Sequence, residues 1–100
     1  PLYEGGCPLL NAAIESDDAN PALREQTYNM LSRLRMAMQT LLRNGKKNYQ
    51  IQEEANIEYY STIFIATMEG GIMMSKLERN KNAILHSITH LRALVQYISV

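Results

Sequence analysis

The sequence predicts an all-α protein, a bundle of helices within one domain. Two observations favour this fold class: apolar residues recur at steps of three and four, and residues typical of helix ends separate these stripes. A third observation argues against strands, because valine occurs only at positions 95 and 100 and no window alternates apolar and polar residues. A chain of 100 residues, 46% of them hydrophobic, fits a single domain over 1–100.

The first two predicted helices begin at prolines. Pro8 suits the first position of a short helix, and Pro21, preceded by the capping residue Asn20, suits the first position of a long one. The long helix ends at Gly45 or continues as a frayed turn towards Asn48. Its apolar stripe consists of Leu23, Thr27, Met30, Leu31, Leu34, Ala37, Met38, Leu41 and Leu42.

The third predicted helix is apolar on two opposite sides. Asn56 is placed to cap it, and Glu58 lies in the first turn, where the helix dipole favours an anion. One side consists of Ile57, Tyr60, Phe64, Met68, Gly71 and Ile72. The other consists of Tyr59, Ile63, Ala66, Gly70, Met73, Met74 and Leu77. Because a helix that is apolar on two sides must be covered on both, we expect one side to contact another subunit.

The last predicted helix follows a polar turn at residues 79–82 and also has two stripes. The first is a heptad-like seam of Ile84, Ile88, Leu91, Val95 and Ile98. The second, less apolar stripe consists of His86, His90, Ala93 and Tyr97. With two packing faces each, the last two helices are expected to pair with their copies in a dimeric four-helix bundle.

Two motifs resemble the C-terminal domain of TetR-family transcriptional regulators. Residues 5–15 (GGCPLLNAAIE) and 20–24 (NPALR) resemble its start, and residues 68–72 (MEGGI) are similar to its L-E-G-A-hydrophobic segment. The sequence departs from the family at Gly71, where a larger residue is common, and at Asn56-Ile57, where an Asp-Pro start is frequent.

The resemblance implies a homodimer built from the last two helices and a pocket for a small-molecule effector between the long helices. It also implies an N-terminal helix-turn-helix domain, which would precede Pro1 and is absent from these 100 residues. DNA would be bound only through that missing domain. The sequence does not identify the effector.

Methionine and aromatic side chains suit an adaptable apolar pocket. We therefore take six residues as candidates for the effector pocket: Met30, Leu34, Met38, Tyr60, Phe64 and Met68. The alternative for each residue alone is ordinary core packing, because apolar stripes at helical spacing are usually core.

The candidates for the dimer interface come from the last two helices. They are Ile63, Ala66, Gly70, Gly71, Met74, His86, His90, Ala93 and Tyr97. Two glycines in mid-helix each cost about 1 kcal/mol relative to alanine, so something should compensate. Close approach of a second helix backbone is the simplest account, and a helix distortion beside a ligand is the alternative.

Several other functions find little support in the sequence. His86 and His90 are spaced to share a metal, but no carboxylate or cysteine accompanies them, so we expect no metal site and no cofactor. A formal net charge of zero argues against direct binding of nucleic acid. The sequence contains no motif for nucleophilic or phosphate chemistry, and we expect no enzyme activity. One cysteine and no long apolar run favour a cytoplasmic protein without a membrane segment.

The sequence thus favours the effector-binding and dimerisation domain of a TetR-type repressor. Two alternatives stay open: a helical dimerisation or interaction module without a ligand, and a small-molecule or metal-binding bundle that uses His86 and His90.

Overall fold

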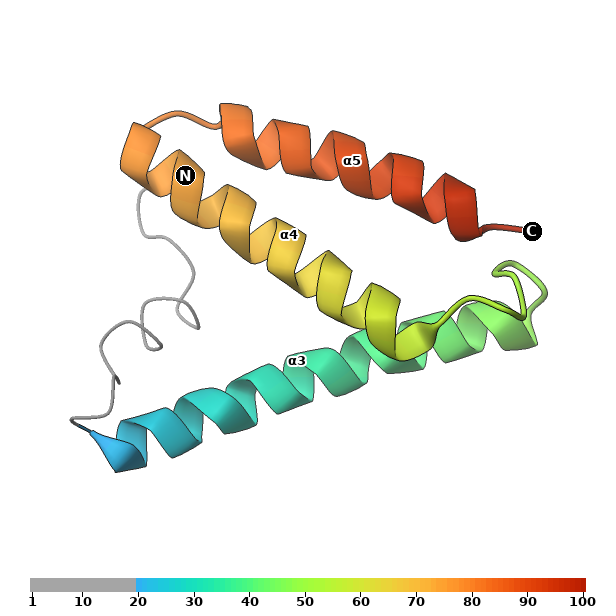
Figure 1. Cartoon of the computed structure of the whole chain (residues 1–100), viewed down its shortest axis with the longest axis horizontal. Helices are drawn as coiled ribbons and strands as arrows, with labels where there is room; N and C mark the ends of the chain where they lie inside the picture. Colours follow the sequence, from blue (N-terminus) through green and yellow to red (C-terminus); the bar gives the residue numbers. More distant parts are fainter. Residues whose placement is uncertain (1–19) are drawn as a thin grey trace.

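The computed structural model describes residues 20–100, which form three α-helices (Figure 1). They are α3 (Pro21–Lys47), α4 (Ile57–Glu78) and α5 (Asn82–Ile98). The described residues contain no strand, and their one strand-like pairing is an isolated bridge between Ile51 and Ser99. The all-α prediction is confirmed for this part of the chain. The helix predicted to begin at Pro8 lies outside the described residues.

The predicted helix caps are present. The Asn20 Oδ1 atom accepts a hydrogen bond from the Leu23 backbone N–H at 3.1 Å. The Asn56 Oδ1 atom accepts one from the Tyr59 backbone N–H at 2.9 Å. Each bond satisfies a backbone donor that the first turn of a helix leaves without a partner. The predicted polar turn follows α4, which ends with Arg79 in the left-handed region at φ 56.

The C-terminus of α3 shows why Gly45 does not end this helix. The helix continues for two residues, to Lys47, and Gly45 is buried within its last turn. A Cβ atom at Gly45 would lie 2.6 Å from the Cδ1 atom of Ile51. Glycine leaves room here for the Ile51 side chain, because the following loop folds back over the helix.

α4 and α5 form a helical hairpin, and α3 crosses it near the start of α4 (Figure 1). The centre of the core takes one residue from each helix, Leu42, Phe64 and Ile98. Partly buried residues surround this centre: Met38, Ile51, Ala55, Ile57, Tyr60, Leu91 and Leu94.

Small residues bring α4 and α5 close together. Gly71 faces Ser87, and a Cβ atom at Gly71 would lie 2.9 Å from the Ser87 Cβ atom and 3.2 Å from the Ala83 carbonyl oxygen. The fully buried Ser75 hydroxyl accepts a hydrogen bond from the Ile84 backbone N–H at 3.0 Å. This bond satisfies a donor in the first turn of α5, where no intrahelical partner exists.

The loop between α3 and α4 holds the C-terminal end of α5. The Gln52 side-chain amide donates hydrogen bonds to the carbonyl oxygens of Tyr97 at 3.1 Å and Ser99 at 3.0 Å. The Gln52 backbone N–H donates to the Ile98 carbonyl oxygen at 2.9 Å. These three bonds, which we call the Gln52 clamp, satisfy carbonyl groups that the last turn of a helix leaves open.

The chain is flat and leaves much of its surface uncovered. Its extents are 44 × 32 × 17 Å and its radius of gyration is 15.2 Å, whereas about 13 Å is usual for 100 residues. Its accessible surface is 7108 Å². A folded monomer of 11.4 kDa is expected to expose about 5,800 Å². The helices in residues 20–100 also expose large apolar side chains, among them Met74, Leu77 and Tyr97, so they have faces which these residues do not cover.

Candidate functional site

The side of α4 that points away from the core is apolar and open. Tyr59, Met73, Met74 and Leu77 are all exposed, as is Ala66, whereas Ile63 and Gly70 are half-buried. The opposite side of the helix contains the buried Phe64 and Ile72. Both sides predicted from the sequence are therefore present, and the chain itself covers only one of them.

The second stripe of α5 is also open. His86, His90, Ala93 and Tyr97 are all exposed. Among residues 20–100 no group of three metal-ligating side chains forms, so the two histidines have no third ligand there. We call the exposed residues of the two stripes the outer face; they are Tyr59, Ala66, Met73, Met74, Leu77, His86, His90, Ala93 and Tyr97.

The adjacent glycines of α4 have different environments. A Cβ atom at Gly70 would meet nothing within 4 Å. Gly71 instead packs against Ser87 of the same chain, so the expected close approach of a second helix occurs within the subunit at this position. Gly71 is therefore not exposed on the outer face, although its position in the sequence made it a candidate for the dimer interface.

The six pocket candidates have mixed environments. Phe64 is part of the central core, and Met38 and Tyr60 pack against it. Met68 is half-buried, while Met30 and Leu34 remain 41% and 40% exposed on α3. None of the six lines the open groove that runs along α5.

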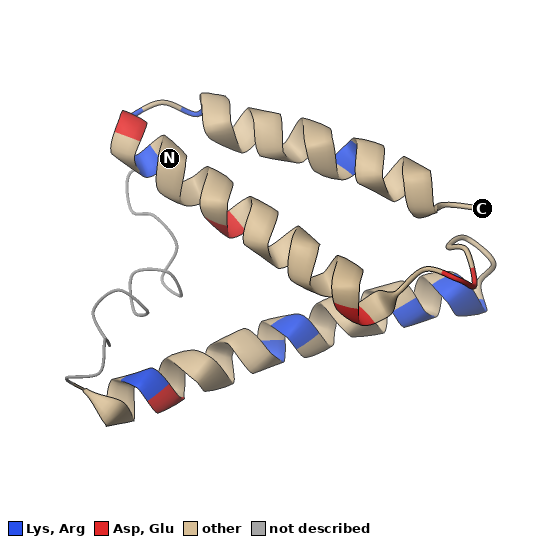
Figure 2. Ribbon diagram, in the orientation of Figure 1, with Lys and Arg blue, Asp and Glu red and all other residues tan. Residues whose placement is uncertain are grey.

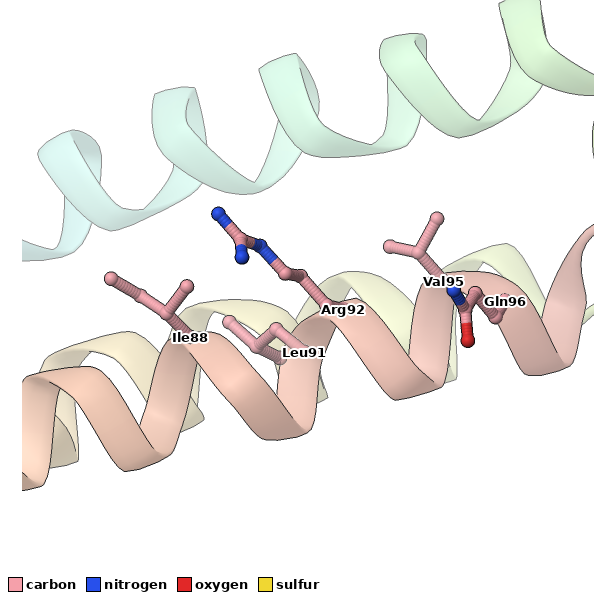
Figure 3. A pocket seen from close by; sticks show the side chains of 5 residues that line it. All are labelled: Ile88, Leu91, Arg92, Val95 and Gln96. Atoms are coloured by element: carbon pink, nitrogen blue, oxygen red, sulfur yellow. The ribbon is translucent and has the colours of Figure 1, made fainter.

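An open groove of about 420 Å³ runs along α5. It is lined by Ile88, Leu91, Arg92, Val95 and Gln96. Figure 3 shows the side chains of Ile88, Arg92 and Val95 pointing from α5 towards the ribbon of α3. At 100° per residue these three positions lie about 160° around the helix from the centre of the exposed histidine stripe. The groove and the outer face thus use opposite sides of α5.

This groove was not predicted from the sequence. Ile88 and Val95 were predicted to lie in one seam with Ile84, Leu91 and Ile98. In the structure Ile84 and Ile98 are buried, whereas Val95 remains 46% exposed. The sequence signal was a charged residue, Arg92, directly beside the apolar seam.

Charged residues are distributed unevenly over the helices (Figure 2). α3 contains six of the ten lysines and arginines, and α5 contains one charged side chain besides its histidines, Arg92. One basic side chain of α3 contacts the hairpin directly, because Arg35 Nη1 donates a hydrogen bond to Thr62 Oγ1 at 3.2 Å. No helix in residues 20–100 has the length and apolar character needed to cross a bilayer.

The same arrangement of helices occurs in solved structures of transcriptional regulators. A TetR transcriptional regulator from Chloroflexus aurantiacus J-10-fl superposes with a TM-score of 0.89 at 36% identity, over 95% of this chain and 48% of that one. A TetR-family regulator from Cytophaga hutchinsonii superposes with a TM-score of 0.92 at 27% identity, over 96% of this chain and 48% of that one. This chain thus spans about half the length of each.

The sequence comparison assigns the family. Residues 1–91 match the family described as "Tetracyclin repressor-like, C-terminal domain". The chain belongs to this family, and the resemblance seen in its motifs is confirmed. None of the curated proteins matches the chain by sequence.

Proposed function

We propose that this chain is the effector-binding and dimerising part of a TetR-type transcriptional repressor. In this proposal a small molecule binds on the α3 side of the hairpin, and the outer face joins two copies of the chain. The bound state is relayed to a DNA-binding domain outside these 100 residues, so that DNA is contacted only there. The protein would act in the cytoplasm and would carry out no catalysis.

The observation that carries the proposal is the outer face. Five apolar side chains of α4 are exposed along one side of the helix, and Ala93 and Tyr97 are exposed on α5. Large exposed apolar patches on soluble proteins mark interaction sites. A two-fold interface needs about 800 Å² from each partner. Exposed apolar side chains such as Met74, Leu77 and Tyr97 contribute to such an area.

The solution mass of the chain tests this proposal. By light scattering after size exclusion we expect twice the chain mass of 11.4 kDa. Met74→Arg should dissociate the dimer, because burying an unpaired charge in an apolar interface is strongly unfavourable. The matched control is Met36→Arg on α3: Met36 is 63% exposed and Met74 is 49% exposed.

Three outcomes would decide against the proposed interface. A monomeric wild-type chain would contradict it, and so would a Met74→Arg variant that stays dimeric. Dissociation of both arginine variants would indicate a non-specific effect of charge.

A helix-turn-helix pattern in the coding sequence ahead of Pro1 would support the regulatory role, and its absence from the complete gene would contradict that role.

The groove on α5 favours a ligand-binding protein over a dimerisation module without a ligand. Its lining combines three apolar side chains, Ile88, Leu91 and Val95, with the polar side chains of Arg92 and Gln96, a combination typical of small-molecule sites. It also lies on the side of α5 opposite the outer face, so a ligand could bind there without blocking the dimer.

A further inference from the structure

The lining of the α5 groove is itself amphipathic. Ile88, Leu91 and Val95 follow each other at steps of three and four residues and form an apolar row. Arg92 and Gln96, four residues apart, form a polar row directly beside it. Both polar side chains carry N–H donors, and an arginine has no acceptor. A matching ligand therefore has an apolar body and a hydrogen-bond acceptor along one edge.

Arg92 fixes the charge of that ligand. It is the one charged residue in the groove lining, and it makes no hydrogen bond or ion pair with any residue in 20–100. Figure 3 shows its guanidinium group extended away from the ribbon of α5. A guanidinium group in this position favours a carboxylate, which it can bind through two parallel N–H···O hydrogen bonds.

The dipole of α5 does not outweigh this preference. The C-terminal end of a helix disfavours anions, but the effect is confined to the last turn. Arg92 lies six residues before the end of α5 at Ile98. The full charge of the guanidinium group therefore dominates at this position.

A second copy of the chain fits the groove poorly. In a two-fold interface each surface patch meets the same patch of the partner. An interface through the groove would therefore bring two Arg92 side chains into one patch, with no acidic residue in the lining to compensate. Like charges at short distance repel, so a small anion is the better occupant.

We propose that the α5 groove binds a small amphipathic carboxylate. Arg92 and Gln96 donate hydrogen bonds to its carboxylate group, and Ile88, Leu91 and Val95 contact its apolar body. This inference rests on the proposed function, because it names the chemical class of the effector.

Octanoate is the probe for this site, with 1-octanol and octylammonium as neutral and cationic analogues of the same chain length. Binding to the full 100-residue chain is measured by calorimetry and located by amide chemical shifts in 1H–15N NMR spectra. We expect saturable binding of octanoate with shifts centred on residues 88–96, and weaker binding of both analogues. Arg92→Gln should weaken octanoate binding about tenfold, the loss typical of a charge-assisted hydrogen bond.

The control variant is Arg43→Gln, which removes the same charge from an exposed site on α3. It should leave octanoate binding unchanged. Equal binding of octanoate and 1-octanol, or equal effects of the two arginine variants, would overturn the proposal. So would dissociation of the dimer by octanoate, because it would indicate that a second copy covers the groove.

The mass of the ligand-free chain separates this inference from the proposed function. A dimer that does not bind octanoate would refute the effector class and leave the dimerising function intact. A monomer would refute the proposed function whatever octanoate does.

Discussion

Replacing Gly70 and Gly71 with alanine, one at a time, should change the stability of the protein differently, with a gain for Gly70→Ala only. Both residues lie in the middle of α4, where each glycine costs about 1 kcal/mol relative to alanine. The two variants therefore gain the same helix propensity. Any difference between them reports the surroundings of the added methyl group.

At Gly70 the methyl group enters open space, since nothing lies within 4 Å of its position. Gly70→Ala should therefore raise the free energy of unfolding by about 1 kcal/mol. At Gly71 the methyl group would lie 2.9 Å from the Ser87 Cβ atom and 3.2 Å from a backbone oxygen of α5. No side-chain rotation relieves these contacts, so the helices must separate. Such overpacking costs about 1–3 kcal/mol, which cancels or exceeds the gain in propensity.

The assay is urea unfolding followed by circular dichroism, at two protein concentrations because dimerisation makes stability depend on concentration. We expect a difference of about 2 kcal/mol between the variants, or about 10 °C in melting temperature for a domain of this size. A double variant with Ser87→Gly and Gly71→Ala places the glycine on α5 and the residue with a Cβ atom on α4. It should recover part of the loss, as a favourable coupling energy in a double-mutant cycle.

Equal stabilisation by the two alanine variants would refute this reasoning, because it would show that α4 and α5 do not touch at Gly71. A Gly70→Ala variant that weakens the dimer would have a different meaning. It would show that a helix of the partner approaches Gly70 as closely as Ser87 approaches Gly71.

Substitutions at three further positions test hydrogen bonds that fix the hairpin, each followed by urea unfolding. Ser75→Ala removes the buried acceptor of the Ile84 N–H and should lower the free energy of unfolding by about 1–3 kcal/mol. A decrease below a few tenths of a kcal/mol would mean that the N–H finds another partner. Gln52→Ala removes two hydrogen bonds to exposed carbonyl groups and should lower the free energy of unfolding by about 1 kcal/mol. Amide hydrogen exchange at the end of α5 should become faster, and unchanged exchange there would contradict the role of the Gln52 clamp. Asn56→Ala should lower the free energy of unfolding by about 1 kcal/mol, whereas Asn56→Asp, which keeps the cap acceptor, should lower it little. Equal decreases for the two variants would argue against capping by this side chain.

The sequence was sufficient for features that depend on neighbouring residues. The caps at Asn20 and Asn56 and the turn after Glu78 follow from side chains within a few positions of the helix ends. The two apolar sides of α4 follow from helical periodicity alone. Because the same pattern results whether a helix is covered by its own chain or by another, the sequence could not show which side is open.

Features that depend on the distance between helices could not be predicted in this way. Gly71 was assigned to the interface because nothing in the sequence shows that Ser87 lies against it. Ile88 and Val95 were placed in one seam with Leu91 because their spacing fits a heptad. In the structure part of the seam is buried and part is exposed, because α3 approaches the hairpin at the start of α4 and α5 packs mainly on α4.

A ligand in the groove can act at a distance only if it favours one of two positions of a movable element. The hairpin has little freedom, because Gly71 and Ser87 are in contact and the Gln52 clamp holds the end of α5. Within residues 20–100, the core contact of α3 at Leu42 lies near its C-terminal end, about 30 Å from Pro21 at the helical rise of 1.5 Å per residue. A rotation of about 5° around that contact displaces Pro21 by roughly 3 Å. We therefore expect α3, rather than the dimer interface, to relay occupation of the groove towards the preceding part of the protein.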